Sequence, residues 1–295
     1  MEDDEGDALC LKARLIQRQD LRRPSGEVST EPGRNVYRAK PTRQVSDDLK
    51  CLKYNMSHAR RGHCLILNCE SFKGAGAPSK REGTELDAER IHRLFGDLGF
   101  DVRVENDPRV KDIDALLTKV AMDESNANAD CFVCFLLSHG RLGEIYASDG
   151  TMKLKNLFSP FEASTTLRGK PKLFFVQACQ EVAANSKPEL EGSWGYDIPA
   201  HPDMFCAFST PPGYFSWRNK ECGSYFMKNL CEVFDASITN DEATSPDLGS
   251  LMITVNRSLS FKFESYAPNI ARLNMKKQTS CIFSTLTKKV IFTKR

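Results

Sequence analysis

The sequence has no long hydrophobic run and almost no net charge. Its longest apolar stretches, HCLILN and CFVCFLL, have the length of a strand, well short of the roughly 18 residues of a membrane span. The first four residues, MEDD, are acidic where a signal peptide is basic. The formal charge of +2 gives no overall attraction to nucleic acid or to an acidic membrane surface. These absences predict a soluble cytoplasmic protein that binds neither nucleic acid nor a membrane.

The sequence also lacks a framework for disulfides or metals. Its 11 cysteines cannot all pair within one chain, and Cys131 and Cys134 lie inside an apolar run, as reduced core thiols do. Their C-x-x-C spacing has no second ligand pair of the kind that zinc sites use. Gly74 and Gly76 are not followed by the G-K-[ST] of a phosphate-binding loop. We therefore expect a reducing compartment, no metal and no cofactor.

Composition divides the chain into four regions. Residues 1–55 are polar, Arg-rich and punctuated by proline, which predicts a short flexible leader. Residues 56–180 and 201–295 form a larger and a smaller region, joined by the turn-rich residues 181–200. In both regions short apolar runs alternate with amphipathic stretches. This rhythm predicts an α/β fold with a doubly wound, mostly parallel sheet and helices on both faces.

The apolar runs are the predicted strands. Buried strands are expected at HCLILN, CFVCFLL and KLFFVQA, and an alternating strand at DVRVEN. MFCAFST and the two closing runs SCIFSTL and KKVIFT predict further strands in the smaller region. EIYASDGTMKL predicts a hairpin around Asp149-Gly150.

Helical spacing marks the segments between these strands. One helix is expected to begin with Thr84 as its N-cap and to end at Gly99. A second is expected after Asp107-Pro108, which would supply a cap and a first-turn proline. Two more helices are expected near residues 224–235 and 247–263.

Two of the buried strands are followed by reactive side chains. His139 follows CFVCFLL and Cys179 follows KLFFVQA, and open α/β sheets bind ligands at the carboxyl ends of their strands. A cysteine nucleophile needs a nearby base, and imidazole titrates in the useful pH range. The N–H groups of Gly140 and Cys179 could form an oxyanion hole. Taken alone, a cysteine and a histidine mean little in a chain of this length, and a packed thiol is the simpler explanation of Cys179, so that alternative stays open at this point.

The surrounding motifs point to one family. Between about residues 54 and 292 the sequence contains, in order, REGTELDA (81–88), LLSHG (136–140), GKPKLFFVQAC (169–179), STPPGYFSWRN (209–219), VNR (255–257) and KKQTSCIFSTLTKK (276–289). In these motifs the chain resembles a caspase, and QAC is the core of that family's active-site signature. With its short leader it is most similar to the effector type. The resemblance implies a caspase-like, six-stranded sheet.

The resemblance also assigns roles to single residues. It implies that Cys179 is the nucleophile and His139 the proton donor and acceptor, with the Gly140 N–H in the oxyanion hole. It further implies that a main-chain carbonyl near Ser79 orients the imidazole, and that Asp197 is the main candidate for cleavage of the 181–200 segment.

The substrate pocket implied by the resemblance consists of Arg81, Gln177 and Arg218. Two guanidinium groups can bracket a short carboxylate with charge-assisted hydrogen bonds, which suits an Asp before the cleaved bond. Phe215, Ser216 and Trp217 would line the adjacent subsite and pair with the substrate main chain. The implied function is therefore hydrolysis of protein substrates after Asp, in the execution of apoptosis.

The chain departs from the family signature at Glu181, where a Gly usually stands. A negative charge there could raise the pKa of the Cys179 thiol and slow its attack. An alternative hypothesis is therefore a catalytically weak homologue that binds and modulates an active caspase. A third is a non-proteolytic thiol enzyme, which would have no need for Arg81 and Arg218.

The resemblance also implies partners. Two copies would meet at the edge strand SCIFSTL, since a bare apolar edge is an aggregation hazard, and form a homodimer of large-plus-small units. Upstream caspases and inhibitor proteins are further possible partners.

Overall fold

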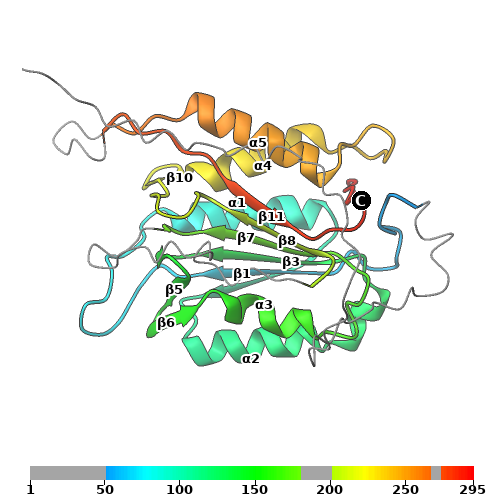
Figure 1. Cartoon of the computed structure of the whole chain (residues 1–295), viewed down its shortest axis with the longest axis horizontal. Helices are drawn as coiled ribbons and strands as arrows, with labels where there is room; N and C mark the ends of the chain where they lie inside the picture. The colour runs from blue at the N-terminus through cyan, green and yellow to red at the C-terminus, as the bar shows by residue number, and fades with distance from the viewer. Residues whose placement is uncertain (1–50, 181–200, 267–273) are drawn as a thin grey trace, which may run out of the picture. The chain divides into compact units, whose positions relative to one another are not determined.

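A computed structural model describes residues 51–180, 201–266 and 274–295. Its centre is a six-stranded sheet in the order β11-β8-β7-β3-β1-β2 (Figure 1). Five strands are parallel, and the edge strand β11 runs antiparallel to β8. The doubly wound, mostly parallel six-stranded sheet is thereby confirmed. The strand bounds are β1 His63–Asn68, β2 Asp101–Asn106, β3 Phe132–Leu137, β7 Lys172–Gln177, β8 Met204–Phe208 and β11 Cys281–Ser284.

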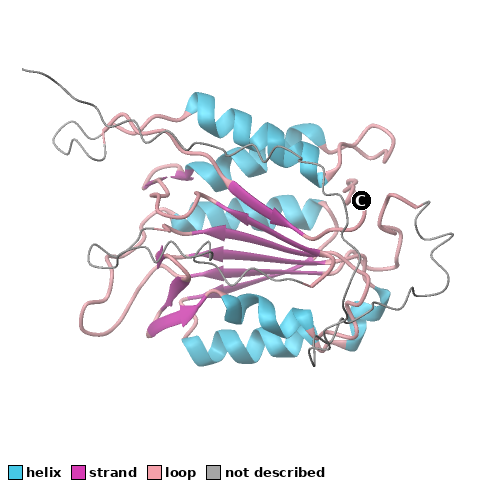
Figure 2. Ribbon diagram, viewed as in Figure 1, coloured by secondary structure: helices cyan, strands magenta, loops and turns pink. Residues whose placement is uncertain are grey.

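Helices cover both faces of the sheet, as predicted. One face carries α1 (Thr84–Asp97), α4 (Tyr225–Ser237) and α5 (Leu248–Lys262). The other carries α2 (Val110–Ala121) and α3 (Lys155–Glu162) (Figures 1 and 2). A short 3-10 helix, Glu124–Asn128, precedes β3. Within the described ranges no helix has both the length and the apolarity to cross a membrane.

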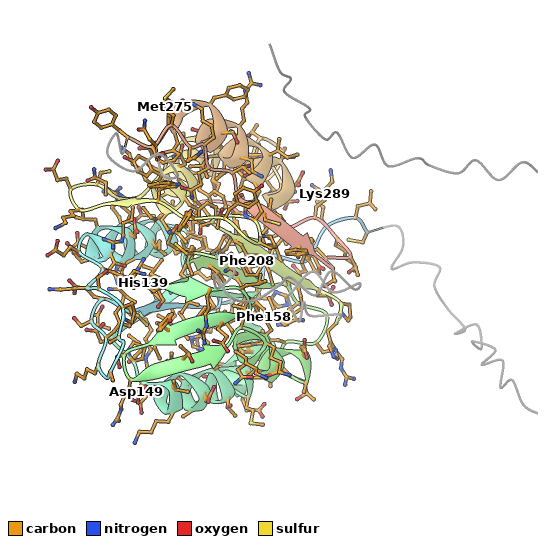
Figure 3. The ribbon with its side chains drawn as sticks, turned by 60° about the vertical axis from the view of Figure 1, so that its left-hand side comes forward. His139, Asp149, Phe158, Phe208, Met275 and Lys289 are labelled. Carbon is orange, nitrogen blue, oxygen red and sulfur yellow. The ribbon has the colours of Figure 1, made fainter. Side chains whose placement is uncertain are left out.

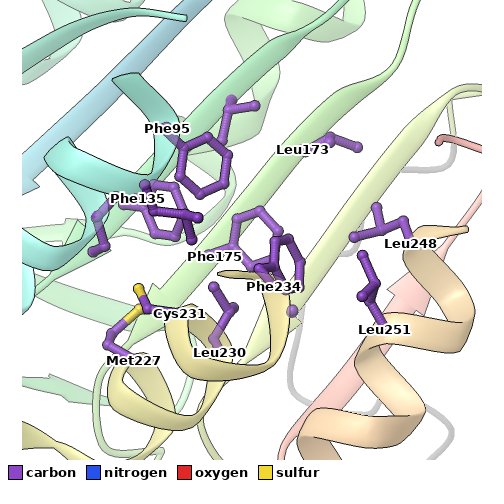
Figure 4. Close-up of a cluster of buried hydrophobic side chains, with 14 of the residues drawn as sticks. Phe95, Phe135, Leu173, Phe175, Met227, Leu230, Cys231, Phe234, Leu248 and Leu251 are labelled. Carbon is purple, nitrogen blue, oxygen red and sulfur yellow. The ribbon is translucent and has the colours of Figure 1, made fainter. Parts of the chain in front are cut away.

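The two central strands are buried on both faces, which explains their unbroken apolarity. Phe135 of β3 stacks on Phe175 of β7 with ring centroids 4.8 Å apart, and Phe95 of α1 meets the edge of Phe135 (Figure 4). On the opposite face Phe132 stacks on Phe161 of α3. These contacts fix β3 and β7 against both helical layers, so the residues that follow them start from rigid positions.

Two small sheets lie outside the central one. β4 (Gly140–Arg141), β5 (Glu144–Ala147) and β6 (Gly150–Lys153) form the first. The predicted hairpin is confirmed, with its turn at Ser148-Asp149 and with Gly150 as the first residue of β6. The second consists of β9 (Arg218–Asn219) and β10 (Gly223–Ser224). These two-residue strands carry no periodic signal and were not predicted.

Three details of the prediction are wrong. Gly83, not Thr84, is the N-cap of α1, in a left-handed conformation that glycine adopts readily. The second helix begins at Val110 with Arg109 as N-cap, because the Asp107 carboxylate accepts hydrogen bonds from two N–H groups of the loop after β1 instead. KKVIFT forms only isolated bridges, although its Val290 and Phe292 are buried.

The larger and smaller predicted regions share one sheet, because β7 of the first pairs in parallel with β8 of the second. Glu181, Asp197 and most of the leader lie outside the described residues, so their predicted roles and the boundaries at 55, 180 and 200 stay predictions. Cys131 and Cys134 are reduced thiols that are buried at β3.

Candidate active site

The parallel strands β3 and β7 end side by side and carry the two predicted catalytic residues. Their register pairs Leu137 with Gln177, so His139 (Figure 3) and Cys179 each stand two residues beyond one aligned pair. The backbones also touch beyond the strands, since a Cβ atom on Gly140 would lie 2.9 Å from the Cys179 carbonyl oxygen. The sheet therefore brings both side chains of the predicted dyad to one end of adjacent strands.

A backbone carbonyl orients His139. The imidazole Nε2 lies 2.8 Å from the Ser79 carbonyl oxygen, the contact that the family resemblance implied. Because a carbonyl can only accept, Nε2 carries the proton, and Nδ1 is the nitrogen that can accept one from a thiol. The ring of Phe72 packs against the imidazole at 5.2 Å between centroids. Burial, together with the charges of Arg81 and Arg218, lowers the pKa of His139, which keeps the imidazole neutral at neutral pH.

The Cys179 thiol is half-buried against the backbone of Ser216. Its Sγ lies 3.6 Å from the Ser216 carbonyl oxygen and accepts from the Ser216 N–H at 3.5 Å. Gly140 approaches the backbone of residues 178–179 so closely that a side chain there would overlap the Cβ atom of Ala178 and the Cys179 carbonyl oxygen. Glycine at 140 thus permits the close approach that an oxyanion hole beside the thiol requires.

Arg81 and Arg218 are distant in sequence and electrostatically coupled in the fold. Arg81, in the loop before α1, is only 2% exposed, and its Nη1 donates to the Cys69 carbonyl and to Thr84 Oγ1. Arg218 begins β9 and is half-buried. Burial and the charge of Arg218 lower the pKa of Arg81 to about 10. Burial also lowers the pKa of Arg218. The lowered pKa of each arginine means that its charged form is disfavoured by its surroundings. An anion beside the two guanidinium groups would therefore be stabilising.

Gln177, the third residue of the predicted substrate pocket, is the last residue of β7. It is 2% exposed, and its Nε2 donates to Ser216 Oγ at 2.7 Å. Its Oε1 is buried and has no hydrogen-bond partner among the described residues. Sequence reasoning missed Gln278, whose Oε1 accepts from the Trp217 N–H and whose Nε2 donates to the Ser209 carbonyl. Gln278 therefore holds the segment that was predicted to pair with substrate.

The predicted subsite aromatics form a larger group than expected. Phe215 and Trp217 lie 6.3 Å apart between centroids, and both are half-buried. Trp217 also contacts Phe263, which packs on Tyr225 at 4.4 Å. The two additional rings come from the end of α5 and the start of α4. No local pattern in the sequence singles them out.

Comparisons with known proteins identify the family. Residues 61–291 match the family Peptidase_C14, described as the caspase domain. The chain is 38% identical over 253 residues to caspase-7 of Gallus gallus, which covers 81% of this chain and 80% of the relative. It is 36% identical over 246 residues to caspase-3 of Oryctolagus cuniculus, over 81% of this chain and 86% of the relative.

A solved structure agrees. The crystal structure of caspase-1 from Spodoptera frugiperda is similar with a TM-score of 0.72 and 39% identity, over 83% of this chain and 96% of that one. This chain belongs to the caspase family. It is a cysteine-type endopeptidase related to the effector caspases.

The start of α1 supports the caspase site in a way that the sequence motifs do not reveal. Gly83 has a positive φ of 86°, and a Cβ atom there would lie 2.8 Å from the Asn219 carbonyl oxygen and 2.7 Å from that of Lys220. Glu82 forms a salt bridge with Lys220. The loop that carries Arg81 is therefore packed directly against the residues that follow Arg218.

We expect Gly83→Ala to destabilise the caspase fold by about 1–3 kcal/mol, because it combines a strained left-handed residue with overlap of two backbone carbonyls. Urea unfolding measures the change. Gly96→Ala is the matched control, since Gly96 lies within the same helix with open space around it. That variant should be neutral or slightly stabilising. Equal free energies of unfolding for wild type and Gly83→Ala would contradict the packing argument.

Proposed function

We propose that this caspase cleaves protein substrates after Asp, with Cys179 and His139 as its catalytic dyad. The observation that carries the proposal is that a buried guanidinium group, that of Arg81, and a half-buried one, that of Arg218, both lie close enough to the imidazole of His139 to lower its pKa. A site that places two cations next to a thiol and a neutral base is suited to a substrate with a negative charge beside the reacting bond.

In the proposed reaction His139 Nδ1 takes the proton of Cys179, and Sγ attacks the carbonyl carbon of the scissile peptide bond. The resulting oxyanion accepts hydrogen bonds from the N–H groups of Gly140 and Cys179. When the C–N bond breaks, the imidazolium gives its proton to the leaving amine, which leaves an acyl-enzyme thioester. Water, deprotonated by His139, then hydrolyses the thioester and restores the thiol.

The proposed preference for Asp follows from charge and length. Arg81 and Arg218 would donate to the carboxylate, with the amide of Gln177 as a third partner after its contact with Ser216 Oγ rearranges. Asn has no charge to balance the cations, and Glu places its carboxylate one methylene too far. Phe215 and Trp217 would then contact the residues upstream of Asp, with Ser216 pairing with the substrate backbone.

Other parts of the proposal rest on the family and on the position of β11. We propose that two copies pair along β11, which is the edge strand of the sheet and is only partly buried. Maturation by cleavage after Asp197, a cytoplasmic location and a role in apoptosis complete the proposal. Effector caspases among its relatives support these assignments.

Turnover of tetrapeptide reporters tests the proposal. The purified, processed protein is incubated with reporters that end in Asp, Asn or Glu, alongside Cys179→Ala. Turnover of the Asp reporter alone, and its loss in Cys179→Ala, is the expected result. Equal turnover of the Asp and Asn reporters would contradict the role of the two arginines.

The same preparation tests the alternative of a weak, modulating homologue. An inert processed chain that changes the activity of a second caspase in mixture would support that alternative and overturn the protease proposal. Mass spectrometry of the expressed chain checks the proposed break after Asp197.

A further inference from the structure

A fully buried carboxylate lies beside the two arginines. The side chain of Asp87, on α1, has no exposed area, and its two oxygens accept from the Ser224 backbone N–H at 2.9 and 3.0 Å. Arg90 Nη1 lies 3.6 Å from Asp87 Oδ1. Burial raises the pKa of Asp87 to about 6, although the Ser224 N–H and the nearby arginines act in the opposite direction. A carboxylate ionised in spite of burial is a marker of functional sites.

The contact with Ser224 connects Asp87 to Arg218. Ser224 of β10 is the cross-strand partner of Arg218 in β9. Gly223, with φ +76°, brings the hairpin so close that a Cβ atom there would lie 2.3 Å from Asp87 Oδ1. Arg90, one helical turn beyond Asp87, donates to the Cys222 carbonyl at 2.6 Å. The hairpin that carries Arg218 is therefore attached to α1 through Asp87 and its neighbour.

Electrostatic interactions connect Asp87 to the two pocket arginines independently of its hydrogen bonds. Three arginines interact electrostatically with the carboxylate: Arg90, whose Nη1 forms an ion pair with it, and Arg81 and Arg218. The buried thiol of Cys231 on α4 is also electrostatically coupled to it. Burial lowers the pKa of Arg81 and of Arg218, and in both cases Asp87 opposes that shift. The carboxylate thus offsets part of the cost of burying these two charged arginines.

We propose that Asp87 is a positioning residue for substrate recognition: its carboxylate holds the β9–β10 hairpin and balances Arg81 and Arg218, so that the two guanidinium groups are charged and aligned for a substrate carboxylate. Asp87 itself does not touch the substrate. The proposal rests on the proposed function, because it needs Arg81 and Arg218 to bind the Asp of the substrate.

The variant Asp87→Asn tests the role. It keeps an oxygen that can accept from the Ser224 N–H and removes the charge. At pH 7.5 we expect KM for an Asp-ending reporter to rise about tenfold while kcat stays within about twofold, because the change weakens binding and leaves the dyad in place. Alkylation of Cys179 by iodoacetamide, which needs no arginine pocket, should keep its wild-type rate.

The pH dependence distinguishes this role from a structural one. Below pH 6 the wild-type carboxyl is protonated, so the difference in KM between wild type and Asp87→Asn should close there. For the wild type alone, KM should rise as the pH falls through about 6, which tests the idea even if the variant fails to fold. The matched control is Glu89→Gln, which removes an exposed carboxylate from the same helix and should leave KM unchanged.

The outcomes are separable. An unchanged KM in Asp87→Asn across the pH range overturns the positioning role, and so does a wild-type KM that stays constant as the pH falls through about 6. If the wild type prefers Asp reporters and Asp87→Asn has the same KM and kcat as the wild type, only this inference is overturned. A wild type that does not distinguish Asp from Asn overturns the proposed function instead.

Discussion

Arg81→Lys should lower kcat/KM for an Asp-ending reporter by about 10³-fold, or about 4 kcal/mol of transition-state stabilisation. Lysine keeps the positive charge but cannot reproduce the planar fork, and it loses the contacts of Nη1 with the Cys69 carbonyl and Thr84 Oγ1. Because Arg81 is almost completely buried, water cannot replace the missing donors. Steady-state kinetics with Asp and Asn reporters measures the loss.

The control for Arg81→Lys is Arg93→Lys, the same substitution at an exposed position of α1. We expect it to match the wild type. The rate of Cys179 alkylation shows whether the site is intact in both variants. A loss of less than about threefold in Arg81→Lys would falsify the proposal that its guanidinium group binds the substrate carboxylate.

The second large effect is expected from His139→Asn. We expect kcat to fall about 10³-fold or more, with KM nearly unchanged, because the imidazole acts on the proton of the thiol and of the leaving amine rather than on substrate binding. Asn has no group that takes up a proton at neutral pH, and its amide nitrogen stands in for Nδ1 rather than Nε2, so the contact with the Ser79 carbonyl is lost together with the base. Single-turnover kinetics separates acylation from substrate binding.

His92→Asn is the matched control, since His92 is exposed on α1 and should not affect turnover. Iodoacetamide provides a second measurement: Cys179 should react more slowly in His139→Asn because fewer thiols are ionised. A kcat close to that of the wild type in His139→Asn would contradict the proposed dyad.

The strands and the dyad were predictable because their signals are local. HCLILN, CFVCFLL and KLFFVQA are unbroken apolar runs, and strands buried on both faces need such runs. His139 and Cys179 follow two of these runs directly. Once the strands are known to be parallel neighbours, the meeting of the two residues needs no further assumption.

The errors have a tertiary cause. Asp107-Pro108 has the composition of a helix start, yet the Asp107 carboxylate accepts from the N–H groups of Glu70 and Ser71 in another loop. KKVIFT has the short apolar run of a strand, but it pairs only at isolated bridges with Lys53 and Asp247. In both segments a contact with a distant part of the chain replaced the structure that the local pattern favours.

The sequence by itself determined the strands of the central sheet, the helices α1, α2, α4 and α5 but not α3, and the placement of a thiol and an imidazole after two buried runs, because each depends on residues close together in the chain. The tertiary structure alone decided the surroundings of Arg81 and Arg218. Gly83, Asp87 and Gln278 support that region through backbone groups of residues that are distant in sequence. Such contacts arise from the packing of whole elements, and no spacing of residue types along the chain encodes them.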